Sequence, residues 1–580
     1  METLYKDLKT LEKKIKDENK HKITKIYQKD FVDGTYIIEN GGIYKVMEDI
    51  VFNPNPDNDY LPKPSQEKYK GLGYSLGFFT MISIKCENVI LDLNGKSLSV
   101  SKEFVIQQRF FSCIELADAP FPMGTGPGNF GQLTPARNVI IKNGFLRRSS
   151  HHGIHGNMNN NVLIENLLIT DFEFIGIALN GASNTYLKDV VVKKNRKSPL
   201  LSTYSAARFA KMFANILLTK YSRFLNDTQI SILTNKRDDL QKVMDVAFNE
   251  ILSTGKTSVS LFNNESGIPD GNVYGVLIKN PGIAINDFSS AQDVGVTRTE
   301  NIYLENVEVK DLRCKVEEVI AISAKGGKGA QTDVAGAVFR IDKLTDANGK
   351  YKGDELSELQ LYLSQVSAEI KYPLGKNSIS MDVVSWCKHD LNIKTLMGKS
   401  QYKFKLGSDS MQHLNKGLLM FRFDGLINLK MKNCKVKRGK NYGLLGNDVV
   451  AGHYLRSSDA AKRDGYFGAW TTGINLAYCE NVSIENTEIK YLASKNGTVV
   501  GINIIYDSSN VKLKDVTLEY FRAGTKKRMG ETYYHAFVKF SDTMPNSIPK
   551  AIPIFGPHRE CNIYICDMKD CSKLSRLNVK

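Results

Sequence analysis

The chain has 580 residues, of which 42% are hydrophobic and 24% charged, as in a folded soluble protein. No apolar run approaches the roughly 20 residues of a membrane helix, and the charged N-terminus METLYKDLKTLEKKIKDENK does not fit a signal peptide, so we expect no membrane insertion and no signal peptide. The net charge of +16 agrees with an anionic partner, but the lysines are scattered. Since only this net charge points to nucleic acid, we do not expect nucleic acid as the partner.

The nine cysteines form no CxxC pair. Cys561, Cys566 and Cys571 are spaced by five, which fits no zinc pattern. Free buried thiols indicate synthesis in a reducing cytoplasm. We therefore expect no metal and no cofactor.

Residues 1–30 predict an N-terminal helix. Its apolar residues Leu4, Leu8, Leu11 and Ile15 are spaced 4, 3 and 4 apart, which forms a short stripe with charged residues between. Two heptads are too few for a stable free coiled coil. The stripe is expected to cap one end of the following domain or to help the chain oligomerise, for example as a homotrimer.

A strand repeat follows the helix. Residues 33–54 predict an entry region for the first coil, and CENVILDLNGKSLSV, residues 86–100, alternates apolar residues and bends at Asn94. One pattern, Asn-apolar-x-apolar-x-(Asn/Asp)-x-x-apolar, then recurs seven times, first at intervals of 23 residues, starting at Asn138, Asn161, Asn184, Asn301, Asn428, Asn481 and Asn510.

This repeat predicts an all-β fold. Alternating apolar residues mark a strand with one buried face, and Asn or Asp favours the bend after it. A period near 23 is one coil of a solenoid whose stacked coils bury a continuous interior, with turn asparagines that bond to one another. We therefore predict a right-handed parallel β-helix with α-helical insertions and an N-terminal helix.

The segment VILDLNGKSL and the NVxIxN coils resemble the pectin-lyase-like superfamily of right-handed β-helix proteins over residues 33–524. The segment NVIIKNGFLRRSSHHGIHGN also resembles β-helix repeat proteins encoded by large DNA viruses of protists. The first resemblance implies a polysaccharide lyase, hydrolase or epimerase. Its known catalytic signatures are incomplete here, since AGHYLR (451–456) offers only Gly-His.

The pattern is interrupted by segments with helical spacing. We predict coils over residues 31–197, a helical insertion over 198–255, further coils over 256–524 with insertions near 350–416 and 437–470, and a C-terminal capping segment over 525–580. The insertions are expected either to pad one wall or to cover a binding face.

The stretch SSHHGIHGNM places three histidines, His151, His152 and His155, within five residues. Aligned at 23 residues, Ile154 points inward and His155 outward, so we expect the trio to be at least partly exposed on one wall. Three interpretations stay open: a polar turn, a catalytic base acting on a sugar, and a metal site, which lacks a neighbouring Asp, Glu or Cys. Asn157 is a candidate glycan contact.

A second candidate site is the segment GHYLRSSDAAKRDGYFGAW. It combines a base, carboxylates and aromatic residues, as sugar sites do. Its candidate catalytic residues are His453, Asp459, Arg463 and Asp464, and its candidate glycan contacts are Tyr466 and Trp470. A loop held by salt bridges is the alternative.

The sequence favours a non-enzymatic structural or attachment protein that binds a glycan, polysaccharide or protein along its solenoid wall. The resemblance to viral proteins implies a virion component. The alternative is a polysaccharide-active enzyme whose site lies at one of the two histidine segments.

Overall fold

The computed structural model describes most of residues 2–118, 134–194, 227–258, 273–280, 299–314, 418–442 and 471–541. Single residues between 211 and 222 and the strand segments 552–553, 560–566 and 575–577 are also described. Among these residues, no helix is both long and apolar enough to span a membrane.

The described strands form two long sheets and one short hairpin. Sheet A contains β1 (Ile23–Ile26), β3 (Gly42–Val46), β4 (Ile50–Phe52), β6 (Glu87–Asp92), β7 (Ser97–Val100), β9 (Arg137–Arg147), β11 (Asn160–Thr170), β13 (Ser183–Lys193), β15 (Glu300–Glu305), β16 (Glu308–Lys310), β17 (Arg313–Cys314), β19 (Ile427–Lys432), β20 (Lys435–Asn441), β22 (Glu480–Ser494), β24 (Ser509–Glu519), β29 (Glu560–Cys566) and β30 (Ser575–Leu577).

Sheet B contains β2 (Tyr36–Ile38), β5 (Ile82–Ile84), β8 (Ser112–Glu115), β10 (His152–Asn157), β12 (Ile175–Asn180), β14 (Val273–Lys279), β18 (Leu418–Asp424), β21 (Thr471–Ala477), β23 (Val499–Ile505), β27 (His535–Ser541) and β28 (Ile552–Pro553). The hairpin joins β25 (Lys527–Arg528) to β26 (Glu531–Thr532). The described helices are α1 (Glu2–Glu18), α3 (Lys102–Gln107), α5 (Asp227–Thr254) and the 3₁₀ turns η1 (Gln28–Phe31), η2 (Pro56–Asn58) and η3 (Glu67–Tyr69).

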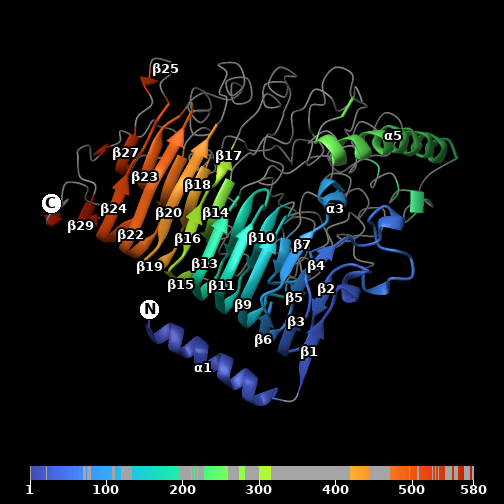
Figure 1. Ribbon diagram of the computed structural model, residues 1–580, viewed down its shortest axis with the longest axis horizontal. Helices are drawn as coiled ribbons and strands as arrows, with labels where there is room; N and C mark the ends of the chain where they lie inside the picture. Colours follow the sequence, from blue (N-terminus) through green and yellow to red (C-terminus); the bar gives the residue numbers. More distant parts are fainter. Residues whose placement is uncertain are drawn as a thin grey trace.

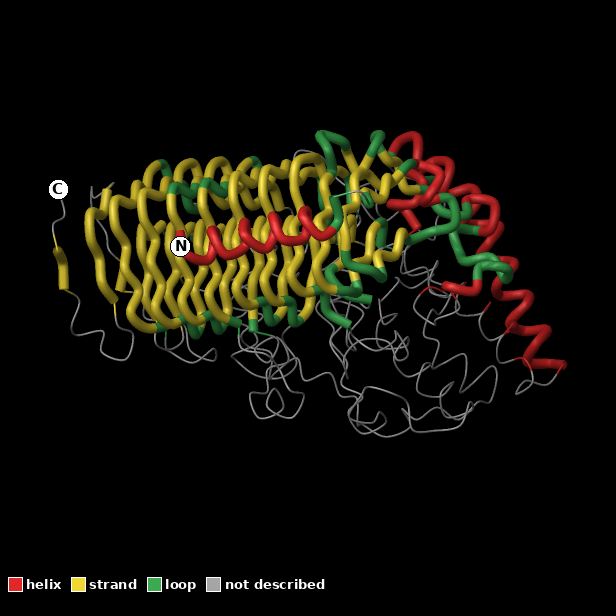
Figure 2. The backbone as a smooth tube through the Cα atoms, turned by 90° about the horizontal axis from the view of Figure 1, so that it is seen from below, coloured by secondary structure: helices red, strands yellow, loops and turns green. Residues whose placement is uncertain are grey.

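The chain alternates between the two sheets, and each strand pairs in parallel with the strand one coil later. The coils stack side by side in a right-handed parallel β-helix (Figures 1 and 2). The predicted register is confirmed, since Ile154 pairs with Ile177 and Val162 pairs with Thr185. The parallel order ends where β29 pairs antiparallel with β24.

Asparagines hold the corners of sheet A. The first Asn of every predicted repeat has a left-handed backbone conformation, which Asn tolerates better than most residues. These side chains bond from coil to coil: Asn161 Nδ2 donates to Asn138 Oδ1 at 2.8 Å, and Asn510 Nδ2 donates to Asn481 Oδ1 at 2.6 Å. Asn184 is an exception, because it donates to Asn160. The predicted asparagine ladder is confirmed.

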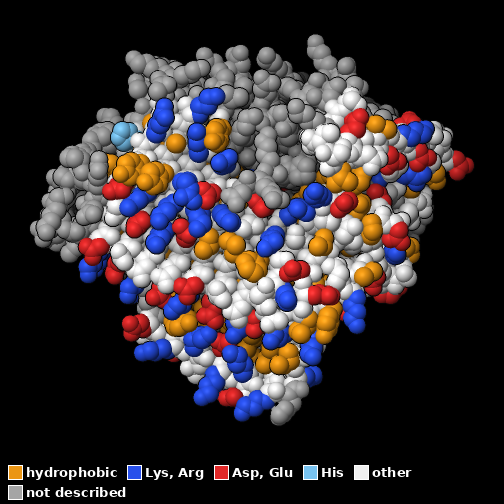
Figure 3. Space-filling view, viewed as in Figure 1, with side chains coloured by type: hydrophobic (Ala, Val, Ile, Leu, Met, Phe, Trp, Pro, Cys, Tyr) orange, Lys and Arg blue, Asp and Glu red, His pale blue; other side chains and the backbone are white. Residues whose placement is uncertain are grey.

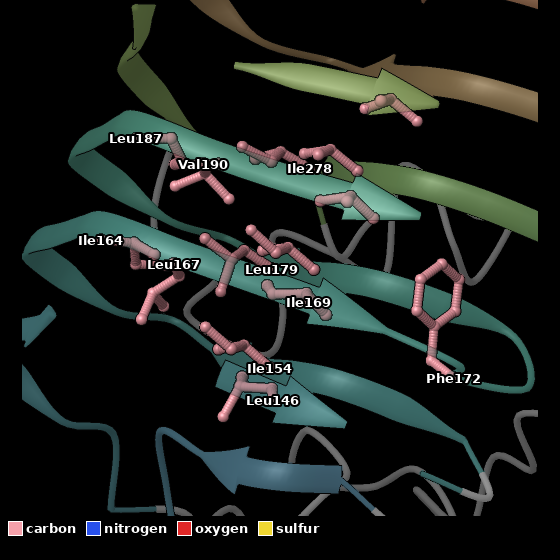
Figure 4. Packing of buried hydrophobic residues seen from close by; sticks show 14 of the residues in the cluster. Leu146, Ile154, Ile164, Leu167, Ile169, Phe172, Leu179, Leu187, Val190 and Ile278 are labelled. Carbon is pink, nitrogen blue, oxygen red and sulfur yellow. The ribbon is translucent and has the colours of Figure 1, made fainter. Parts of the chain in front are cut away.

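The core fills the space between the sheets with aliphatic side chains from successive coils (Figure 4). A column of glycines on sheet B keeps the space between the sheets narrow enough for side chains to fill. Its members are Gly153, Gly176, Gly275, Gly473 and Gly501, and Met420 takes the place of a glycine between Gly275 and Gly473. A Cβ atom on Gly176 would lie 2.4 Å from Val192 Cγ1, so the glycine makes room for a side chain of sheet A. Gly153, Gly275 and Gly473 face sheet A side chains in the same way, and Gly501 faces Phe521.

Helix α1 lies along the side of the solenoid and not across its end (Figure 2). Its 17 residues rise about 1.5 Å each, which matches about five strand spacings of about 4.8 Å, and it contacts β3, β6, β9, β11 and β13. Leu8 and Ile15 are buried against Ile90, Ile140 and Leu163 on the outer face of sheet A. The predicted cap position was therefore wrong, and the apolar stripe is covered within its own chain.

Two of the expected boundaries differ. Strand β1 pairs with β3, so the coils begin at Ile23 and not at residue 31. Strand β20 continues to Asn441, beyond the expected start of an insertion at 437. Helix α5 confirms a helical insertion between β13 and β14. The whole insertion expected at 350–416 lies outside the described residues.

Candidate functional site

The three histidines lie on the outer face of sheet B. His155 pairs with Ala178 in β12 and with Glu115 in β8, and it alternates with Ile154, whose side chain belongs to the core. The predicted outward position is thus confirmed. The predicted exposure is wrong, because His151, His152 and His155 are only 8%, 7% and 7% exposed.

Both ring nitrogens of His155 are bonded. Nδ1 lies 2.8 Å from each carboxylate oxygen of Glu115, and Nε2 lies 3.2 Å from Asn180 Nδ2. Asn180 can only donate through Nδ2, so Nε2 accepts its hydrogen bond, and the protonated Nδ1 donates a hydrogen bond to the carboxylate of Glu115. Asn180 Nδ2 also donates to Asn157 Oδ1 at 2.8 Å. These bonds join three successive strands of sheet B.

Stacked rings continue the cluster. The ring centroids of His151 and His152 are 3.8 Å apart, those of His152 and His155 are 5.1 Å apart, and Phe174 stacks on His151 at 5.3 Å. Burial, with the nearby charges of His151, His155 and Lys279, holds the pKa of His152 well below its usual value. His152 is therefore neutral at neutral pH.

The sequence alignment missed Glu115. It precedes His155 by 40 residues, because residues 116–136 add a longer connection to this coil, so a search at 23 residues passes over it. The signal that could have found it is SCIEL, in which a single Glu stands in a short apolar strand.

A buried ion pair lies further along the same face. Asp424 Oδ2 accepts hydrogen bonds from Arg422 Nε at 2.8 Å and Nη2 at 2.7 Å, and Arg422 Nη1 donates to Tyr274 Oη at 3.0 Å. Burial lowers the pKa of Arg422, but its interactions with Asp424 and Tyr274 together outweigh burial and the net shift is upward. Sequence reasoning missed this pair too, although two charges in the apolar strand LLMFRFD are a recognisable signal.

The other predicted residues divide into two groups. Asn157 is fully buried, and its side chain bonds to the next coil. His453, Asp459, Arg463, Asp464, Tyr466 and Trp470 lie outside the described residues. Within the described part of the chain, no three His, Cys, Asp or Glu side chains are grouped to hold a metal ion.

No protein-family model matches the chain, and no curated protein matches it. Among solved structures, it is similar to the A-module of the mannuronan C-5 epimerase AlgE6 from Azotobacter vinelandii, with 8% identity, a TM-score of 0.23, and coverage of 90% of this chain and 89% of that one. It is also similar to PfbA, a surface adhesin of Streptococcus pneumoniae, with 9% identity, a TM-score of 0.18, and coverage of 92% and 88%. With scores this low, neither likeness bears on function.

Proposed function

We propose that this protein is a non-enzymatic structural or attachment protein that binds a glycan along the outer wall of its β-helix. The observation that carries the proposal is the bonding of His155. Glu115 occupies one ring nitrogen and Asn180 the other, so the imidazole joins neighbouring coils. A histidine held in this way supports a structural role for the cluster.

The regular wall supports glycan binding. Register partners stand in straight rows along the solenoid axis, one strand spacing of about 4.8 Å apart, so a polymer lying along the axis meets the same kind of contact repeatedly. Tyr491 and Tyr520 are exposed at one such row, stacked with centroids 4.8 Å apart and planes 3° apart. Aromatic side chains contact the C–H groups of sugars favourably. The resemblance to viral proteins makes a virus particle the setting that we propose.

The test combines binding with chemistry. Purified protein is applied to a panel of anionic and neutral polysaccharides, and bound glycan, unsaturated products and new reducing ends are all measured. We expect binding without either product. Release of either product, abolished by His155→Ala in a protein that stays folded, would overturn the proposal.

A polysaccharide-active enzyme is the second candidate, and His152 favours it. This histidine is neutral, and its Nδ1 has no hydrogen-bond partner among the described residues. Tyr274 stands two strands away in the same row, and Arg422 bonds to it. A base, a phenol and a cation are the groups needed to remove a proton beside a sugar carboxylate.

The two candidates differ in what His152→Gln does. If the protein is an enzyme that uses His152 as its base, His152→Gln should abolish product formation and keep glycan binding. If the protein forms no product on any substrate, His152→Gln has no activity to remove and the second candidate fails.

A further inference from the structure

Four lysines occupy one row on the outer face of sheet A. Register pairs Lys193 with Lys310, Lys310 with Lys437, and Lys437 with Lys490, so four successive coils each place a lysine at the same height. We call this set the lysine row. It ends at Thr170 on one side and at Glu519 on the other.

Such a row has an electrostatic cost, because like charges directly opposite each other on neighbouring strands are destabilising. Acidic neighbours offset only part of it. Lys310 pairs with Glu308 at 2.5 Å, and Glu488 is shared between Lys437 at 3.5 Å and Lys490 at 3.8 Å. Lys490 also pairs with Glu519 at 3.5 Å. A second row of sheet A, from Lys45 to Lys514, alternates sign at every coil. The lysine row therefore departs from a pattern that the same sheet follows elsewhere.

The lysine row is accessible and its surroundings are basic. The side chains of Lys310, Lys437 and Lys490 are between 23% and 27% exposed. Exposed cations flank them at Arg313, Lys435, Arg438 and Lys440. Lys and Arg side chains gather over β16, β20 and β22 on this face (Figure 3).

We propose that the lysine row binds a linear acidic polysaccharide that lies along the solenoid axis. The inference rests on the proposed glycan-binding function and names its ligand class, a polymer of uronic acids or similarly charged sugars. The row presents one ammonium group per coil, and a chain with regularly spaced carboxylates can pair with each in turn. The polymer adds negative charge to that of Glu308, Glu488 and Glu519.

The structure favours a sugar polymer over nucleic acid. Proteins that hold single strands combine a basic track with aromatic rings on which the bases stack. Here Tyr491 and Tyr520 form one exposed pair beside Lys490, at one end of the row, and not a series of rings along it. A duplex would turn its phosphates away from a straight row.

The experiment measures binding of the full chain to polygalacturonate. Fully methyl-esterified polygalacturonate is the matched probe, because it keeps the backbone and removes the charge. The test variant is Lys437→Gln with Lys490→Gln. The control variant is Lys512→Gln with Lys514→Gln, which removes the same charge from exposed lysines of other rows.

We expect binding to polygalacturonate that weakens as salt rises, little binding to the ester, and a loss of about fivefold to tenfold in the test variant. Replacing the same two lysines by arginine should restore binding. Equal losses in the test and control variants would show an effect of net charge alone and overturn the proposal.

Other outcomes distinguish a failure of this inference from a failure of the proposed glycan-binding function. Equal binding to the ester, or binding to neutral glycans only, would contradict the acidic ligand class but would still support glycan attachment. If the protein binds no glycan at all, both the acidic ligand class and the proposed glycan attachment are contradicted. Tighter binding of a single-stranded polynucleotide through the same lysines would overturn the ligand class.

Discussion

Lys188 and Glu305 form an ion pair of 3.3 Å between neighbouring strands, although helix α5 lies between them in the sequence. They belong to one row of sheet A in which the charge changes sign at every coil: Lys45, Asp92, Lys142, Glu165, Lys188, Glu305, Lys432, Glu485 and Lys514. Because a shift by one coil would bring like charges together, this charge row helps each strand to find its correct neighbour.

Reversing one member should be worse than neutralising it. Glu305→Lys would place a lysine between Lys188 and Lys432, while Glu305→Gln only removes the pair. We expect Glu305→Lys to be less stable than Glu305→Gln by about 1–2 kcal/mol, with up to about 1 kcal/mol from each like-charged neighbour. Urea unfolding measures the difference.

Salt provides the control for this prediction. At 1 M salt the screening length is about 3 Å, so the gap between the two variants should shrink. A gap that is the same at low and high salt would show that the lysine disturbs packing and would argue against the charge row.

Helix α1 extends the charge row with its own residues. Glu12 bonds to Lys142 at 2.5 Å and to Lys16 at 2.6 Å, and Lys9 bonds to Glu165 at 2.9 Å. Burial raises the pKa of Glu12, but its bonds to Lys142, Lys16 and Lys9 outweigh burial and lower the pKa to about 2.

A lowered pKa makes the contribution of Glu12 dependent on pH. The carboxylate stabilises the fold fully above its unfolded pKa of 4.5, and this stabilisation is lost as pH falls from there towards 2. The stability advantage of the wild type over Glu12→Gln should therefore be full at pH 7 and clearly reduced at pH 3. Unfolding by urea across this range measures it, with the exposed Glu18→Gln as control. A constant advantage would contradict the assigned pairing.

The sequence predicts the coils well because each coil repeats the same physical requirement. Each coil needs alternating apolar residues along its strand and a residue with left-handed backbone where the chain bends. The regular spacing of Asn138, Asn161 and Asn184 is therefore enough to identify these bends. Periodicity does not show what lies on the outer wall. The position of Leu8 on sheet A depends on an apolar row formed by Ile90, Ile140 and Leu163, which are scattered through the sequence.

The candidate site was harder to predict for the same reason. Its partners are neighbours only after the coils stack, and coils of unequal length hide the register. Glu115 stands 40 residues before His155, and Tyr274 is separated from Arg422 by 148 residues. Burial of the histidines could not be predicted either, because an outward direction on a strand does not specify what packs over it.

The glycine column predicts a steric requirement. Gly176→Ala would place a Cβ atom 2.4 Å from Val192 Cγ1 and 2.6 Å from the carbonyl oxygen of Gly275. We expect a loss of about 1–3 kcal/mol from overpacking, measured by thermal or urea unfolding.

A second substitution tests the cause. Val192→Ala removes the side-chain contact but leaves the backbone contact with Gly275, so the double variant should lose less stability than the sum of the two single variants. Additive losses would show that the side chain of Val192 is not what excludes a larger residue at Gly176.

The bonding of His155 predicts strong coupling with Glu115. His155→Ala leaves a carboxylate that is 4% exposed without its imidazole donor, although Ser112 Oγ still reaches it at 3.2 Å. We expect a loss of about 2–4 kcal/mol, because an unpaired buried charge is costly. Glu115→Gln keeps an acceptor oxygen and should cost less. The double variant should be more stable, by about 1 kcal/mol or more, than the sum of the two single losses predicts.

The exposed His535→Ala serves as control and should change the free energy of unfolding little. Losses that simply add would mean that the pair does not hold the coils together, and that the structural role proposed for His155 is wrong.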